Sequence, residues 1–356
     1  MLLTVIVFIV LLGLLVFVHE LGHFLAARFF GIQVEEFGFG FPPRLIGRRW
    51  GKTLYSLNWL PLGGFVKIKG EQGEARDEAD SFSAKPVWQR FIVLAAGVIM
   101  NIIFCAILLI IGYQVGVPSV IDQQTGGIQR EVKLQIADVV PGSPAAVAGL
   151  KAGDVLVSLA GREMRTPQEV QYFVEPRDHI SLDLVVRRGP EELKLGITPL
   201  NVPGKNGAAL GVALVQTGIV SYPAWTAVAR GVESTGDLLV EIVGAFAFLL
   251  KDIFVHGQVT ADLSGPVGIA VITGQVVQLG WLYLLQFAAL LSMNLAILNF
   301  IPFPALDGGR ALFLVFEKIR GRAVSAHVEN WFHTAGFALL LLLVAFITYH
   351  DLSRIF

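Results

Sequence analysis

Residues 1–30 read MLLTVIVFIVLLGLLVFVHELGHFLAARFF and carry no charged side chain before the motif His19-Glu20-Leu21-Gly22-His23. A helix needs about 20 consecutive apolar residues to cross the hydrocarbon core of a bilayer, which is about 30 Å thick. The segment lacks a basic N-terminal region and a suitable cleavage site, so we expect it to be retained rather than removed as a signal peptide. It therefore predicts a membrane-spanning helix that ends in a histidine motif.

The composition of the whole chain agrees with a membrane protein. Of its 356 residues, 54% are hydrophobic and 15% are charged, whereas an ordinary soluble domain carries roughly 25% charged residues. The net charge of -1 argues against a nucleic-acid-binding protein, which would be basic. A single cysteine, Cys105, excludes an internal disulfide bond and a zinc cluster built from cysteines.

Three further segments are long and apolar enough to span a membrane, at residues 91–112, 281–300 and 331–349. The fold class predicted is a polytopic α-helical membrane protein with about four transmembrane helices. The stretch 237–255 has an apolar core of only nine residues between charged side chains. We expect interfacial amphipathic helices over 221–262, and the sequence leaves open whether 237–255 lies at the interface or inserts.

The regions between the spans have a different composition. Residues 117–200 contain short β-rich runs separated by Pro-Gly and Gly-Pro turns, which predicts an inserted α+β domain. The loop 31–90 alternates polar and apolar residues over 53–59 and 65–69, on either side of Gly63-Gly64. This alternation predicts a membrane-associated β-hairpin. The membrane domain would then comprise an N-terminal part, 1–112, and a C-terminal part, 281–356.

Loop charges indicate the orientation. The loop after the first span and the loop after the third span are both basic, and short basic loops stay in the cytoplasm. Four spans then place both termini and the 117–200 domain outside the cytoplasm. We expect a multi-pass protein of the bacterial cytoplasmic (inner) membrane.

The histidine motif predicts a zinc site. Four residues apart on a helix, His19 and His23 lie about 40° apart around the axis, so both imidazoles can bind one Zn²⁺ ion. Glu20 lies beside them and can serve as general base toward a water molecule at the metal. Ionisable groups within a span are costly and mostly functional.

A catalytic zinc ion generally has three protein ligands, and the candidates for the third are Asp307 and histidines at positions 179, 256, 327, 333 and 350. Asp307 follows the third span, where Pro302 and Pro304 must break the helix. A carboxylate on broken backbone at membrane depth requires a protein or aqueous surrounding. Taken alone, the segment also fits a turn with an interfacial aspartate.

Together these motifs resemble the site-2 protease family of intramembrane zinc metalloproteases, in particular its bacterial RseP-type group. The resemblance rests on His19–His23, on the segment Asn299…Pro302…Leu306-Asp307-Gly308, and on the motifs at 37–40, 61–67 and 265–269. It extends to the turn–helix–turn pattern of 141–154, which is similar to that of PDZ domains of bacterial proteases. It implies His19, His23 and Asp307 as zinc ligands, Glu20 as base, and Asn299 as a residue that holds the unwound substrate.

The resemblance also implies the substrates, which would be single-span transmembrane proteins such as trimmed anti-sigma factors, and leftover signal peptides, cut within the lipid bilayer. An unwound stretch could pair with the edge of the hairpin, so Gly63, Gly64 and Phe65 are candidate substrate-binding residues. The single PDZ-like domain could bind a peptide tail or act as a steric filter, and both remain open. The alternative function is a catalytically silent membrane adaptor that binds protein tails through the PDZ-like domain.

Overall fold

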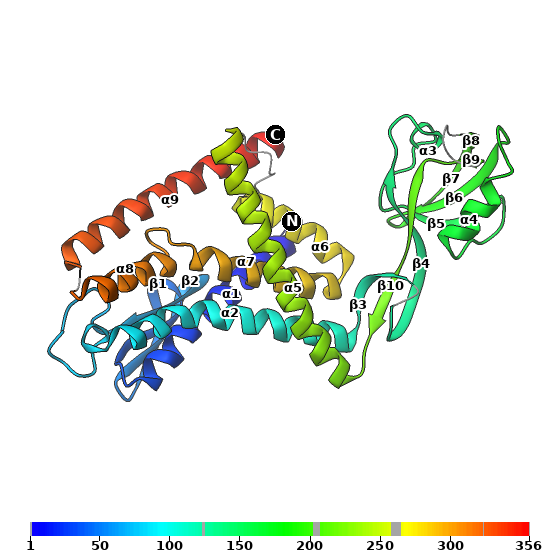
Figure 1. Ribbon diagram of the computed structural model, residues 1–356. Coiled ribbons are helices and arrows are strands. Elements are labelled where there is room, and N and C mark those ends of the chain that lie inside the picture. The colour runs from blue at the N-terminus through cyan, green and yellow to red at the C-terminus, as the bar shows by residue number, and fades with distance from the viewer. Residues whose placement is uncertain (1, 123–124, 202–206, 258–264, 323, 356) are drawn as a thin grey trace. The chain divides into compact units, whose positions relative to one another are not determined.

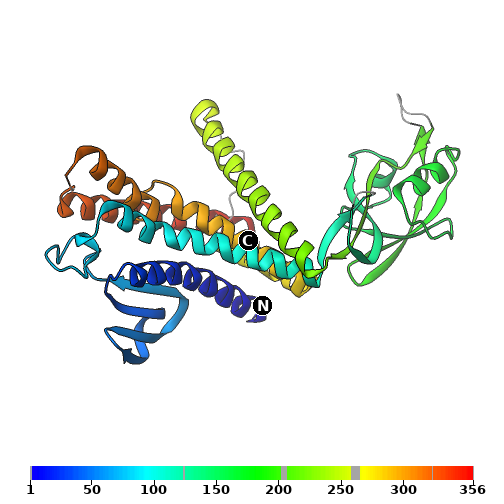
Figure 2. The same cartoon turned by 60° about the horizontal axis from the view of Figure 1, so that its bottom comes forward.

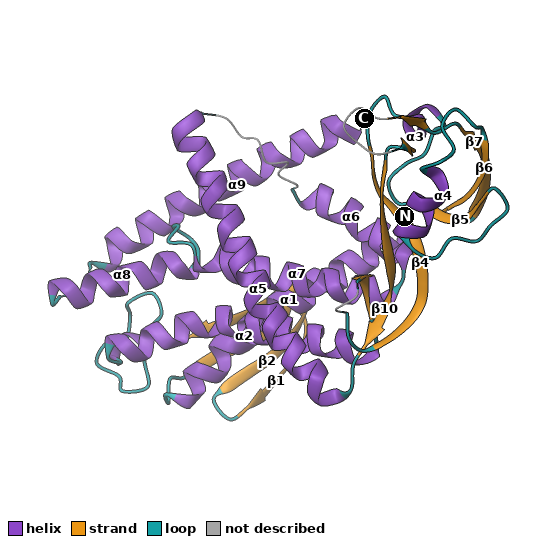
Figure 3. Ribbon diagram, turned by 45° about the vertical axis from the view of Figure 1, so that its right-hand side comes forward, coloured by secondary structure: helices purple, strands orange, loops and turns teal. Residues whose placement is uncertain are grey.

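The computed structural model describes residues 2–122, 125–201, 207–257, 265–322 and 324–355. The chain divides into two compact units, of which unit 1 comprises residues 1–112 and 228–356 and unit 2 comprises residues 113–227. Figure 1 shows their elements, and Figure 3 shows that unit 1 is mainly helical whereas most strands belong to unit 2.

Unit 1 contains the long apolar helices. Its helices of seven residues or more are α1 (Leu2–Phe29), α2 (Val87–Val115), α5 (Ala224–Lys251), α6 (Pro266–Leu279), α7 (Trp281–Phe300), α8 (Asp307–Arg320) and α9 (Ala326–Ile355). Short helical turns occupy Phe82–Ala84 (η1) and Asp252–His256 (η2). By length and composition, α1, α2, α7 and residues 327–353 of α9 could cross a membrane. These four agree with the four predicted spans.

The helix α5 differs from the prediction for this region. It begins at Ala224 and runs for 28 residues, so the predicted stretch 237–255 is the second half of one long helix and the following turn. Within the described residues α5 is not among the helices that qualify as spans. Residues 258–262 of the predicted interfacial region lie outside the described residues.

A small sheet, β1 (Val34–Trp50) with β2 (Thr53–Ile68), packs against α1 in unit 1 (Figure 2). Residues 34–39 pair with 64–68 on one side and with 54–57 on the other, while residues 44–50 pair with 53–58. The expected hairpin between 53–59 and 65–69 is therefore wrong in its pairing, because 34–39 lies between the two segments. The tight turn falls at Gly51-Lys52 instead.

Unit 2 is an α+β module around a six-stranded sheet of order β3-β10-β4-β5-β6-β7. Its strands are β3 (Val117–Ile121), β4 (Ile128–Val139), β5 (Val155–Leu159), β6 (Leu182–Arg188), β7 (Glu191–Ile197), β8 (Leu200–Asn201), β9 (Ala208–Ala209) and β10 (Val212–Ser221), and its helices are α3 (Pro144–Val147) and α4 (Pro167–Val174). The module predicted to end near residue 200 continues further, because β10 pairs with both β3 and β4.

Candidate metal centre

His19 and His23 lie one turn apart on α1, and both are buried. Their Nε2 atoms are 3.2 Å apart. The facing helix α2 can approach this closely because Gly97 has no side chain: a Cβ atom there would lie 2.5 Å from His23 Nε2 and 2.7 Å from His19 Cε1. The glycine thus leaves room for both imidazole rings.

The loop that follows α7 brings Asp307 to the same place. Pro302 and Pro304 interrupt the helix, and Ala305 adopts a positive φ of 76° before α8 begins at Asp307. Gly308 and Gly309 pack against backbone carbonyls of the preceding loop, so closely that a Cβ at either position would lie 2.2 Å from an oxygen atom. The loop is therefore folded tightly on itself and presents one carboxylate to the histidines.

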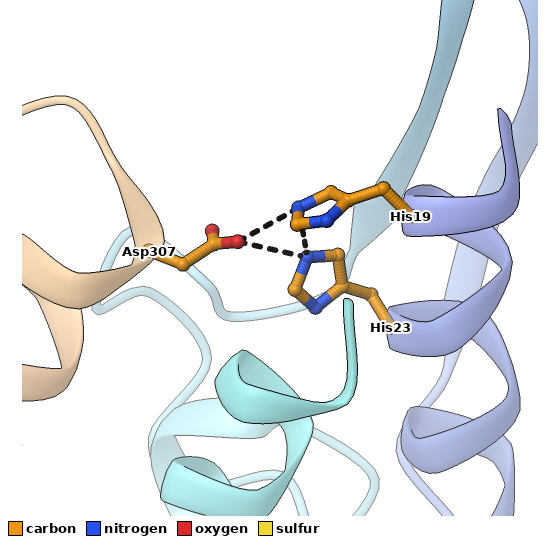
Figure 4. Close-up of side chains that lie close together, drawn as sticks. All are labelled: His19, His23 and Asp307. Atoms are coloured by element: carbon orange, nitrogen blue, oxygen red, sulfur yellow. Dashed lines mark hydrogen bonds and ion pairs between the residues drawn. The ribbon is translucent and has the colours of Figure 1, made fainter. Parts of the chain in front are cut away.

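The three side chains form a triangle of ligand atoms (Figure 4). Asp307 Oδ2 lies 2.8 Å from His19 Nε2 and 3.2 Å from His23 Nε2. In a tetrahedral zinc site with bonds of about 2.0–2.1 Å, neighbouring ligand atoms are about 3.3 Å apart. Among the histidine, cysteine and acidic side chains of the described residues, these three form a group that could together hold a metal ion.

The hydrogen bonding of His23 also fits a cation. Its Nδ1 donates to the carbonyl oxygen of Val93 at 2.8 Å, which places the ring proton on Nδ1 and leaves a lone pair on Nε2. That lone pair faces the Asp307 carboxylate. A ligand histidine that donates its other ring N–H to a backbone carbonyl is the arrangement found at zinc sites. The residues present therefore fit Zn²⁺.

Glu20 stands beside the triangle without joining it. Its Oε2 atom accepts a hydrogen bond from the backbone N–H of Val66, 3.1 Å away. The carboxylate is thereby held between α1 and segment 64–68, beside the candidate metal ligands. This position suits a proton acceptor that is not itself a ligand.

The other predicted site residues lie close by. Asn299, in the last turn of α7, has its Nδ2 3.4 Å from His19 Nε2. Gly63 has a φ of 143°, and a Cβ there would lie 2.9 Å from Val16 of α1, while the backbone of Gly64 passes close to Phe17. Phe65 pairs with Gly38. Within the described residues segment 64–68 has a strand partner on one side only, so it is an edge.

Two residues near the site have roles that were not predicted, although His333 was among the candidate third ligands. Asn101 of α2 is fully buried, and its Nδ2 lies 3.4 Å from His19 Nδ1. His333 of α9 accepts a hydrogen bond at Nδ1 from the N–H of Ala305, 3.0 Å away, so it supports the Asp307 loop rather than binding the metal. The sequence does carry a signal for Asn101, because a strongly polar side chain within a span is mostly functional.

Comparisons with known proteins identify the family of this chain. The model of peptidase family M50 matches residues 7–343, a range that includes both metal motifs. The regulator of sigma-W protease RasP of Bacillus subtilis is 33% identical, and the match covers 99% of each chain. The zinc metalloprotease RasP of Geobacillus kaustophilus is 30% identical over 99% of this chain and 98% of the relative. The PDZ domain of an SdrC-like protein from Listeria monocytogenes matches 26% of this chain and 93% of that structure, with 18% identity and a TM-score of 0.22.

Proposed function

We propose that this chain, which belongs to peptidase family M50 and is an intramembrane zinc metalloprotease, binds its zinc ion through His19, His23 and Asp307. The observation that carries the proposal is the convergence of one ligand atom from each residue, all within 4.8 Å of one another. The ligands come from α1 and from the start of α8, 284 positions after His23 (307 − 23). A silent adaptor would need no such site.

Glu20 is the proposed general base. Zinc, when bound, polarises the scissile carbonyl and makes the attacking water more acidic. Glu20 takes a proton from that water and passes it to the amine that leaves, so one water molecule is consumed and one peptide bond is broken. The Val66 N–H holds one oxygen of Glu20 and fixes the direction of the carboxylate.

The substrate class is single-span membrane proteins within the bilayer. A transmembrane helix hides its carbonyl groups in hydrogen bonds to the residue four positions on, so it must unwind before attack. The edge segment at Gly63, Gly64 and Phe65 lies beside α1 and offers main-chain groups to an unwound strand. Asn299 is placed to hold the same stretch next to His19.

One relative is named a regulator of sigma-W protease, which supports trimmed anti-sigma factors as substrates of this chain, with leftover signal peptides in the same chemical class. The basic loops after α1 and α7 support a location in the bacterial inner membrane, with unit 2 outside the cytoplasm as a PDZ-like domain. This domain would select substrates, either by binding a peptide tail or by excluding bulky ectodomains.

Replacing Glu20 with Gln tests the proposal. The amide keeps the shape of the side chain but cannot accept a proton, so cleavage of a single-span substrate should fall to background while bound zinc stays at the wild-type level. His19→Ala is the matched comparison and should lose both zinc and activity. If Glu20→Gln cleaved at the wild-type rate, the base would be assigned wrongly.

A further inference from the structure

Asn101 carries a buried polar atom that the described structure leaves without a partner. The residue lies in the middle of α2 and is 0% exposed. Its Oδ1 is one of two buried side-chain nitrogen or oxygen atoms in the described residues that have no hydrogen-bond partner. A buried amide oxygen without a partner is costly, so this atom calls for a donor.

A candidate donor on the neighbouring helix is His19. Its Nδ1 lies 3.4 Å from the Nδ2 of the Asn101 amide, while its Nε2 faces Asp307 Oδ2 at 2.8 Å. To bind a metal ion through Nε2, the ring must carry its proton on Nδ1. An Nδ1–H group needs an acceptor in front of it.

The Asn101 amide can present either a hydrogen-bond donor or an acceptor to His19, because its oxygen and nitrogen exchange places on a half-turn about the Cβ–Cγ bond. With Nδ2 forward, the amide donates to Nδ1 and drives the ring proton onto Nε2, where it blocks metal binding. With Oδ1 forward, the amide accepts from Nδ1–H and leaves the Nε2 lone pair free. The second orientation gives the buried oxygen a donor, and Nδ2 then takes the position that Oδ1 now occupies.

Helix α2 already supplies an acceptor for the Nδ1–H group of the second histidine, His23. Val93 O accepts from His23 Nδ1 at 2.8 Å, and Asn101 lies two turns further along α2 with Gly97 between them. The Val93 carbonyl and the Asn101 amide thus both belong to α2 and face the Nδ1 atoms of His23 and His19. Gly97 leaves space for the rings themselves.

We propose that Asn101 is the positioning residue of His19: its Oδ1 accepts the Nδ1 proton and so fixes the tautomer that binds the metal through Nε2. The inference rests on the proposed zinc site and extends it to a residue on α2. Asn101 acts through His19 and does not touch the substrate. Supporting groups of this kind change metal affinity by about 10–100-fold.

The structure separates this role from a packing role. Ser292 of α7 donates to the backbone carbonyl oxygen of Asn101 at 2.8 Å, and that link between α7 and α2 does not depend on the side chain at position 101. Substituting the side chain therefore tests the amide alone. Ser292→Ala removes the helix link and keeps the amide, which makes it the matched control.

The experiment measures zinc affinity of the full-length protein in detergent by competition with a chelator. Asn101→Leu has a similar volume but no acceptor, and it should bind zinc about 10–100-fold more weakly. Asn101→Asp keeps an acceptor oxygen, and Ser292→Ala keeps the amide, so both should bind close to the wild type. Asn101→Ala is a second variant without an acceptor, in case the leucine disturbs folding.

Wild-type affinity in Asn101→Leu or Asn101→Ala would overturn the inference. So would an equal loss in Asn101→Asp and Asn101→Leu, because position 101 would then serve packing. Wild type and His19→Ala are measured in parallel. If these two bound zinc equally, the zinc site itself would be wrong, and this result is distinct from failure of the Asn101 assignment alone.

Discussion

At the scale of single residues, the metal centre depends on glycines as much as on its ligands. Gly97 allows α2 to lie against both imidazoles, and Gly308 allows the Asp307 loop to fold onto the end of α7. Gly22 plays the same part on α1, where a Cβ would lie 2.3 Å from the carbonyl oxygen of Ala96. The ligands converge because the backbones around them can approach so closely.

Gly97→Val should therefore displace the histidine rings. Its Cβ would meet both rings at less than 3 Å, and overpacking of this kind costs about 1–3 kcal/mol. We expect zinc affinity to fall about tenfold or more, as 1.4 kcal/mol is a factor of ten. Gly244→Val, on α5, is the control, because a Cβ there meets nothing within 4 Å. Equal zinc affinity of the two variants would contradict this packing account.

The sequence could suggest the three candidate ligands because two of them share one helix turn and the third follows a helix broken by prolines. His19 and His23 need only the geometry of a helix. By contrast, the roles of Asn101 and His333 depend on partners 82 and 28 positions away. No local pattern reports such pairs, so the structure was needed to find them.

At the scale of elements, the small sheet beside α1 matters most. Its edge segment 64–68 holds Glu20, the neighbour of His19 in the sequence, through the N–H of Val66. The alternating pattern of 53–69 predicted strands here, but it could not predict that residues 34–39 insert between them. Strand order depends on pairing between distant segments, and alternation alone does not specify the partner.

Gly38→Val should disturb this edge without removing the metal. A Cβ at Gly38 would lie 2.5 Å from the ring of Phe65, so the valine pushes the edge segment away from β1. We expect kcat/KM to fall about tenfold, for a cost within about 1–3 kcal/mol, with zinc content unchanged. Gly47→Val, also on β1 but in the exposed segment 44–50, is the control. Full activity of Gly38→Val would show that the edge does not position the substrate or Glu20.

In unit 2 an ion pair makes stability depend on pH. Asp154 is 1% exposed, and both its oxygens accept from the Arg188 guanidinium at 2.7 Å. This guanidinium holds the pKa of the Asp154 carboxyl below its usual value. As the pH falls, Asp154 therefore takes up a proton in the unfolded chain before it does so in the folded chain. The stabilisation by the ion pair is complete above about pH 4–5 and is lost as the pH falls toward the pKa of Asp154 in the folded chain.

Arg188→Met should remove that pH dependence and destabilise unit 2 at pH 7, because the buried Asp154 carboxylate loses its charged partner. The measurement is proteolysis of the full-length protein at pH 7 and at about pH 3, below the pKa of an aspartate in the unfolded chain, following cleavage within residues 113–227. The wild type should become more susceptible at the lower pH, and the variant should be susceptible at both. A wild type equally resistant at both values would contradict the role of this pair.

At the scale of the whole molecule, the four apolar helices were predictable because hydropathy is a property of local composition. The extent of unit 2 was not, since β10 pairs with β3, which begins 95 residues earlier (212 − 117), and with β4. The length of α5 was not predictable either, because its charged residues interrupt the apolar pattern of what is one continuous helix. Long-range pairing and helix length both depend on tertiary context.

The proposed orientation is testable with reporter fusions. Fusions near residues 75 and 320 should report a cytoplasmic location, and fusions near residue 160 and at the C-terminus should report the opposite side, because of the basic loops. A cytoplasmic reading at residue 160 would overturn both the orientation and the number of spans.

The most direct test of the zinc site is X-ray absorption spectroscopy at the zinc edge of the purified full-length protein. The account predicts nitrogen and oxygen ligands at about 2.0–2.1 Å, with scattering from two imidazoles in the wild type and in Glu20→Gln. Asp307→Ala should lose an oxygen ligand and most of the bound zinc. A third imidazole, a sulfur ligand, or an unchanged zinc shell in Asp307→Ala would contradict the assignment of His19, His23 and Asp307.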